Sequence, residues 1–96
     1  MIQQVTTTAE SPVSIKPLIE GAIRAQLRLL QHGVNRTRER LTGFEKQYGL
    51  PTDEFERRFR AREIQETLDY LDWWMEIEAL HLLQEKILAL QGARLD

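Results

Sequence analysis

A seven-residue repeat in the first half of this 96-residue sequence constrains the fold more than any other feature. Eight positions, all apolar except Thr37, follow one another at alternating spacings of four and three residues: Ile23, Leu27, Leu30, Val34, Thr37, Leu41, Phe44 and Tyr48. This spacing places the eight side chains on one face of an α-helix, and many of the residues between them are charged. The repeat therefore predicts a long amphipathic helix over residues 18–48, about 45 Å in length.

A stop signal and a new start signal follow this helix. Gly49 comes directly after the last repeat position and Pro51 follows it, which is the usual sequence at a helix C-terminus. Thr52 is placed as the N-cap of a second helix, because two acidic residues come after it in what would be the first turn. Phe55 and Phe59 are four residues apart and share one face, so we expect this helix to be short and held in place by these two rings.

A third helix is predicted to begin between Ile64 and Thr67 and to run to about Gln91, with Gly92 as its stop. Its apolar band is wider than a single antiparallel helix can cover, since one helix–helix seam needs only about two positions in seven. The fold predicted is all-α, an antiparallel hairpin of two long helices with a short intervening helix, paired into a helical bundle. The band comprises Tyr70, Trp73, Ile77, Leu80, Leu83, Ile87 and Leu90, with Leu68, Leu71, Met75 and Leu82 beside them.

The chain divides into a flexible N-terminal arm over residues 1–16 and a helical hairpin domain over residues 17–96. Pro12 and Pro17 interrupt any helix in the arm. The sequence contains no cysteine, its first ten residues lack the features of a signal peptide, and no apolar run is long enough to span a bilayer. We therefore expect a cytoplasmic protein.

Charge is unevenly distributed along the chain. Residues 1–62 carry 11 Lys and Arg against 7 Asp and Glu, whereas residues 63–96 carry 2 against 8. A basic first half and an acidic second half attract each other, so this distribution favours antiparallel packing of the two halves, either within one chain or between two.

No recognisable catalytic, cofactor-binding or metal-binding pattern is present. The nearest is the pair Glu78 and His81, whose Glu-x-x-His spacing occurs in di-iron helical bundles. Such a site also needs inward-facing glutamates from other helices, and those of the first helix lie off the repeat. We expect a non-enzymatic protein with no cofactor and no metal.

The aromatic residues are the strongest candidates for a functional surface, because all seven fall within residues 44–74. Trp73 and Trp74 point about 100° apart on a helix, so one is expected in the core, and the other either completes a local cluster or anchors a partner protein. The predicted partner-binding residues are Phe44, Tyr48, Phe55, Phe59, Tyr70, Trp73, Trp74 and Ile77. A possible contact with nucleic acid or an acidic partner is assigned to Arg57, Arg58, Arg60 and Arg62, which neighbouring glutamates could equally neutralise.

The segment from Phe44 to Phe55, which reads FEKQYGLPTDEF, is followed by Phe59 and by an acidic stretch with Trp73. This pattern resembles a group of small helical prokaryotic proteins, some of which are taken to be antitoxins of toxin–antitoxin modules. The sequence departs from that group at residues 60–63, where Arg-Ala-Arg-Glu replaces a Gly-containing turn. The resemblance implies an antitoxin-like subunit that binds and neutralises a toxin. The alternatives are a homodimeric structural or adaptor bundle and, third, a nucleic-acid-binding autoregulator.

Overall fold

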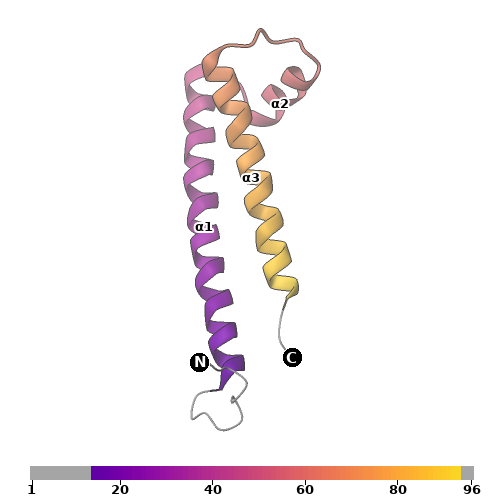
Figure 1. Cartoon of the computed structure of the whole chain (residues 1–96). Helices are drawn as coiled ribbons and strands as arrows, with labels where there is room; N and C mark the ends of the chain where they lie inside the picture. The colour runs from indigo at the N-terminus through magenta and orange to yellow at the C-terminus, as the bar shows by residue number, and fades with distance from the viewer. Residues whose placement is uncertain (1–13, 94–96) are drawn as a thin grey trace.

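The computed structural model describes residues 14–93, which form three helices and no strand (Figure 1). Helix α1 spans Ile15–Tyr48, α2 spans Thr52–Arg60 and α3 spans Leu68–Gly92. The two long helices lie side by side and antiparallel, and α2 packs beside the end at which the chain turns from α1 into α3 (Figure 1). The predicted all-α hairpin with a short intervening helix is therefore confirmed, whereas its pairing into a larger bundle stays a prediction.

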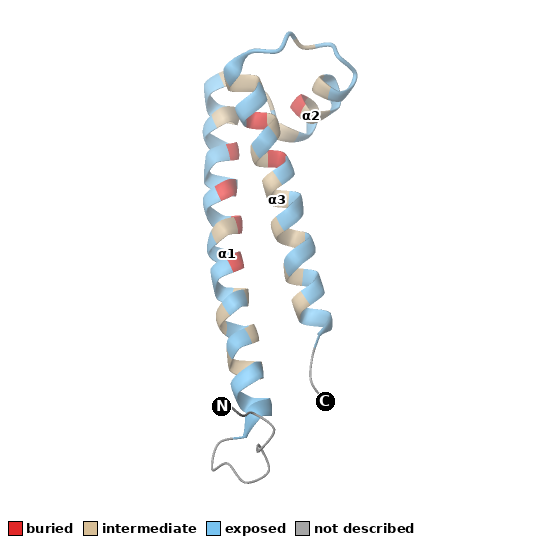
Figure 2. Cartoon of the chain, viewed as in Figure 1, coloured by how far each residue is buried: buried red, intermediate tan, exposed pale blue. Residues whose placement is uncertain are grey.

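The repeat of α1 forms the interface with α3. Its four buried residues are Leu30, Val34, Thr37 and Leu41, and all of them lie on the predicted face (Figure 2). Burial decreases toward the N-terminus, where Ile23 and Leu27 are only half-buried. One uniform sequence pattern therefore corresponds to two environments, a closed interface near the turn and an open one near the chain ends.

The register of the two long helices leaves the N-terminal end of α1 without a partner helix. Arg40 forms an ion pair of 2.8 Å with Glu76, and a Cβ atom built on Gly33 would lie 3.3 Å from the side chain of Leu83. In an antiparallel helix pair, the numbers of residues that lie opposite each other have a constant sum, and for both of these pairs the sum is 116. The last residue of α3, Gly92, therefore lies opposite residue 24 of α1. Residues 15–23 of α1 consequently extend beyond the end of α3.

Helix α1 begins at Ile15 rather than near residue 18. Pro17 lies in the first turn, where the N–H group that proline lacks would have no intrahelical partner, so the ring does not interrupt the helix there. Residues 15 and 16 of the predicted arm therefore belong to α1, and residues 1–13 lie outside the described residues.

The junction between α1 and α2 differs from the prediction by one residue. Gly49 ends α1 with a φ of 63°, and its N–H donates to the carbonyl oxygen of Glu45 at 2.8 Å. Thr52 is the first residue of α2 and not its N-cap, which is Pro51. The carboxylate of Glu45 accepts a hydrogen bond of 2.7 Å from the N–H of Thr52 and so supplies the capping acceptor that proline cannot provide.

A left-handed residue ends α2. The N–H of Glu63 donates to the carbonyl of Arg58 at 2.9 Å and the N–H of Arg62 donates to the carbonyl of Phe59 at 3.1 Å, which is the Schellman pattern. Arg62 has a φ of 59° and occupies the position that glycine usually takes. The chain then reaches Thr67, whose Oγ1 accepts from the N–H of Tyr70 at 3.1 Å and caps α3.

Substituting Arg62→Gly should stabilise the fold by about 1 kcal/mol, because a non-glycine residue in the left-handed region costs about 1–2 kcal/mol and the greater freedom of glycine in the unfolded chain offsets part of the gain. Urea unfolding followed by circular dichroism measures the change. A matched Arg58→Gly substitution inside α2 should destabilise instead, and equal effects of the two glycines would contradict this explanation.

Candidate functional site

The predicted aromatic residues form one continuous cluster at the closed end of the hairpin. The indole ring of Trp73 is stacked between Phe55, at a centroid distance of 4.0 Å and an interplanar angle of 1°, and Phe44, at 5.4 Å and 8°. Its Nε1 donates to Oγ1 of Thr52 at 3.3 Å, so the polar atom of the ring is satisfied. Trp73 therefore joins all three helices.

Burial divides the eight predicted partner-binding residues into two groups. Phe55, Trp73 and Ile77 are buried, with exposed fractions of 0%, 0% and 2%. In this structure they form core and offer no surface to a partner. The remaining five are half-buried: Phe44, Tyr48, Phe59, Tyr70 and Trp74. A role of these five in partner binding stays a prediction.

Trp74 lies outside the main stack, as the angular separation of the two tryptophans predicts. Its ring stacks on Phe59 at 5.0 Å and 15°, and the guanidinium carbon of Arg60 lies 4.7 Å from the ring centroid. A cation over an indole face is a favourable contact. The three side chains fix one another, although the ring of Trp74 stays partly accessible to solvent.

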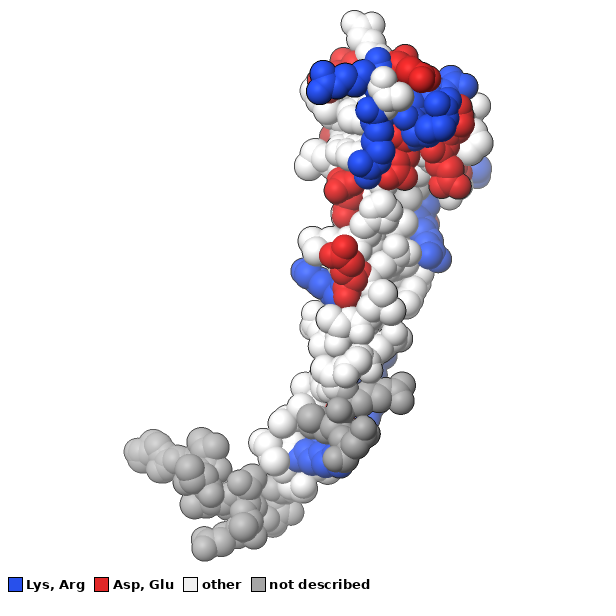
Figure 3. Space-filling view, turned by 90° about the vertical axis from the view of Figure 1, so that its right-hand side faces the viewer, with Lys and Arg blue, Asp and Glu red and all other residues white. Residues whose placement is uncertain are grey.

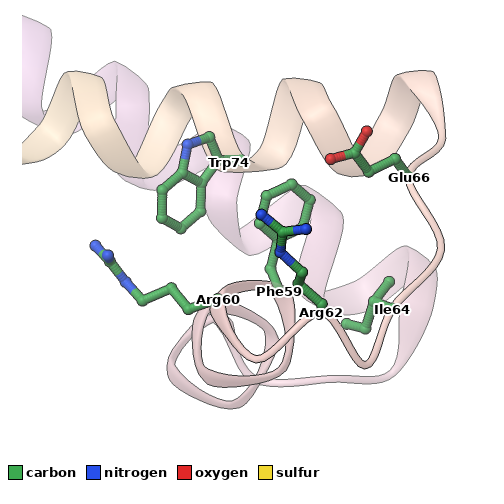
Figure 4. A pocket seen from close by; sticks show the side chains of 6 residues that line it. All are labelled: Phe59, Arg60, Arg62, Ile64, Glu66 and Trp74. Carbon is green, nitrogen blue, oxygen red and sulfur yellow. The ribbon is translucent and has the colours of Figure 1, made fainter.

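A pocket opens beside Trp74 between α2, α3 and the segment that joins them (Figure 4). Residues from the predicted partner-binding set and from the predicted arginine set meet in this pocket, since two of the aromatic residues and two of the arginines contribute to its wall. Ile64 and Glu66 were not predicted, because their placement depends on the left-handed turn at Arg62, which no glycine marks in the sequence. The pocket is lined by Phe59, Arg60, Arg62, Ile64, Glu66 and Trp74.

All three arginines of α2 form ion pairs with glutamates of the same helix. Arg57 and Arg58 contact the carboxylate of Glu54 at 2.7 and 2.8 Å, and hydrogen bonds from these two side chains lower the pKa of Glu54 to about 2. Because the folded pKa is depressed, this contribution to stability is present above the ordinary value near 4.5 and is lost as the pH falls toward 2. Arg60 pairs with Glu56 at 3.1 Å. None of the ion pairs within 4.0 Å among residues 14–93 involves Arg62.

The hydroxyl group of Tyr48 donates a hydrogen bond to the carboxylate of Asp69 and so links the last turn of α1 to the first turn of α3. This hydrogen bond, assisted by desolvation and by the negative charge of Asp69, raises the pKa of Tyr48 to about 12. The neutral phenol is favoured in the folded state. Its contribution to stability is therefore present below pH 10 and is lost as the pH rises toward 12.

An alkaline titration followed by ultraviolet absorbance should show one of the two tyrosines ionising near pH 12. The substitution Asp69→Asn should lower that pKa toward 10, because it removes the negative charge and the carboxylate acceptor. Tyr70→Phe serves as the control that assigns the remaining transition to Tyr48. A Tyr48 pKa that Asp69→Asn leaves unchanged would contradict the assigned cause.

The described residues 14–93 contain no group of three potential metal ligands from His, Asp and Glu. Glu78 and His81, the closest approach to a metal motif in the sequence, are both exposed. None of the helices in this part of the chain combines the length and the apolar composition required to cross a membrane.

Comparisons with known proteins do not assign this chain to a family. No protein-family model matches the chain, and no curated protein or solved structure is significantly similar to it.

Proposed function

We propose that this chain is a non-enzymatic interaction module that binds a protein partner at the pocket beside Trp74. The observation that supports this proposal best is the position of Trp74, which is held by Phe59 and Arg60 and yet remains accessible in a pocket wall. Trp and Arg are the residues most enriched among binding hot spots, and a side chain that is already ordered loses little entropy on binding.

The pocket favours a partner segment that combines an apolar side chain with a carboxylate. Phe59, Ile64 and Trp74 provide the apolar wall, and Arg62 provides a cation without an ion-pair partner among the described residues. Nucleic acid is less well supported, because three acidic residues of α2 balance its three arginines and local ion pairs engage all three of those arginines.

The resemblance of residues 44–78 to antitoxins suggests the kind of partner. We propose that the partner is a toxin whose activity the chain neutralises by occupying its surface. The function rests on this resemblance together with the accessible pocket, and the two can be tested in one system.

The experiment is coexpression with the product of the adjacent reading frame, read out as cell growth, together with calorimetric titration of the two purified proteins. Arg62→Glu should weaken binding by at least about tenfold and abolish growth rescue, since it replaces the cation proposed to pair with the carboxylate of the partner by an anion. Arg28→Glu, an exposed charge reversal on α1 remote from the pocket, is the matched control and should bind like the parent.

Circular dichroism of both variants would verify that the fold is retained. Binding of Arg62→Glu within twofold of the parent would refute the pocket as the contact site. A neighbouring product that neither slows growth nor binds the chain would refute the antitoxin role.

A further inference from the structure

Helix α3 carries a second apolar face that neither α1 nor α2 covers. At about 100° per residue, the apolar side chains of this face fall within a strip about 60° wide, on the side of α3 away from Trp73 and Ile77. An antiparallel partner on the Trp73 side cannot reach them. These exposed residues are Leu68, Leu71, Met75 and Leu82, and we refer to them as the outer strip.

The outer strip continues across the hairpin onto α1. Met75 and Gly43 line the same groove between the two long helices, so the strip and this side of α1 share one face of the molecule. The same side of α1 carries the exposed Leu29, and nothing lies within 4 Å of a Cβ built on Gly43. Helix α2 packs on the other side of α3, through Trp74, and leaves this face open.

The two helices that border the open face carry equal and opposite charges. With His counted as neutral, α1 has seven Lys and Arg against three Glu, a net charge of +4, and α3 has one Lys against five Asp and Glu, a net charge of −4. In the view of Figure 3, charged side chains gather most densely at the end of the hairpin that carries α2.

We propose that the open face binds a second copy of this chain, with a two-fold axis parallel to the long helices. This symmetry places α1 of each copy on α3 of the other, so that charges alternate in sign around a four-helix bundle. A two-fold axis perpendicular to the helices and within the interface would instead place α1 on α1 and α3 on α3, and would oppose like charges. The opposite net charges of α1 and α3 therefore favour a second copy of this chain as the occupant of the open face, and they favour the two-fold axis parallel to the helices.

This dimer leaves the proposed partner site free. The pocket beside Trp74 lies on the side of α3 that contacts α2, whereas the second copy covers the outer strip. The second copy also accounts for the apolar band of α3, whose width exceeds what one partner helix can bury.

Sedimentation equilibrium at micromolar concentration should give the mass of a dimer, and Met75→Lys should raise the dimer dissociation constant by at least about tenfold. The matched control is Leu88→Lys. Leu88 and Met75 have similar exposed fractions, 69% and 64%, but Leu88 lies on another side of α3 and should tolerate lysine. A monomeric parent, or equal dissociation of the two variants, would overturn the proposal.

Distance measurement tests the orientation. The chain contains no cysteine, so Lys46→Cys offers a single site for a spin label near the closed end of α1. With the axis parallel to the helices, the two Cα atoms of residue 46 should lie about 15 Å apart, because diagonal helices in a bundle are separated by about 14 Å. A perpendicular axis that crosses the midpoint of the overlap between α1 and α3, near residue 36, would separate them by about 30 Å along the helices, given the rise of 1.5 Å per residue. A long distance in a dimer would refute the proposed symmetry.

Binding of the toxin candidate to Met75→Lys separates this inference from the proposed function. A monomeric variant that still binds through the pocket would show that the two surfaces are independent.

Discussion

Trp73→Ala should reduce the free energy of unfolding by about 4 kcal/mol, the largest effect that we expect from any single substitution in this chain. The side chain is fully buried, stacks on Phe55 and Phe44, and donates a hydrogen bond to Thr52. Its removal leaves a cavity that three helices border, and a domain of this size has a total stability of only about 5–10 kcal/mol.

Urea unfolding measured by circular dichroism tests this value, and two further variants separate its causes. Trp73→Phe should lose only about 1–2 kcal/mol, because it keeps an aromatic ring in the stack and removes the Nε1–H donor. Trp74→Ala removes a half-buried ring that stacks mainly on Phe59 and should cost less than Trp73→Ala. Equal losses at the two tryptophans would contradict the view that Trp73, and not Trp74, is the core tryptophan.

The order of helices could be predicted from local sequence patterns because each pattern has a local physical cause. The repeat from Ile23 to Tyr48 sets the face of α1, and Gly49 ends α1 in the left-handed region. The errors are equally local. Pro17 was expected to exclude helix, yet it lies in a first turn that does not need its N–H, and Glu45 supplies the capping acceptor that was expected from Thr52.

The candidate site was less predictable, because its burial depends on contacts distant in sequence. Clustering of the aromatic residues in the sequence predicted that they meet at one end of the hairpin, but Phe55 and Trp73 become core only when α2 folds back against α3. Likewise, Ile64 and Glu66 reach the pocket only through the turn at Arg62, which adopts a left-handed conformation without glycine. Sequence periodicity reports which face of a helix is apolar and does not report which apolar face remains uncovered.

The same limitation leads to a matched pair of substitutions in the repeat of α1. Leu41 and Leu27 occupy equivalent positions of the seven-residue repeat, two repeats apart. The sequence alone therefore predicts that they contribute equally to stability. The structure places Leu41 in the core cluster with an exposed fraction of 7%, whereas Leu27 is half-buried near the end of α3.

Leu41→Ala should therefore cost about 3 kcal/mol, the lost transfer free energy of the side chain together with the cavity that remains. Leu27→Ala should cost about 1 kcal/mol in the isolated hairpin, since water already reaches the site and the helix ends can adjust. Both values follow from urea unfolding at a concentration low enough to dissociate any dimer. Equal losses would mean that the two ends of the hairpin are equally closed, in contradiction to the different burial of Leu41 and Leu27.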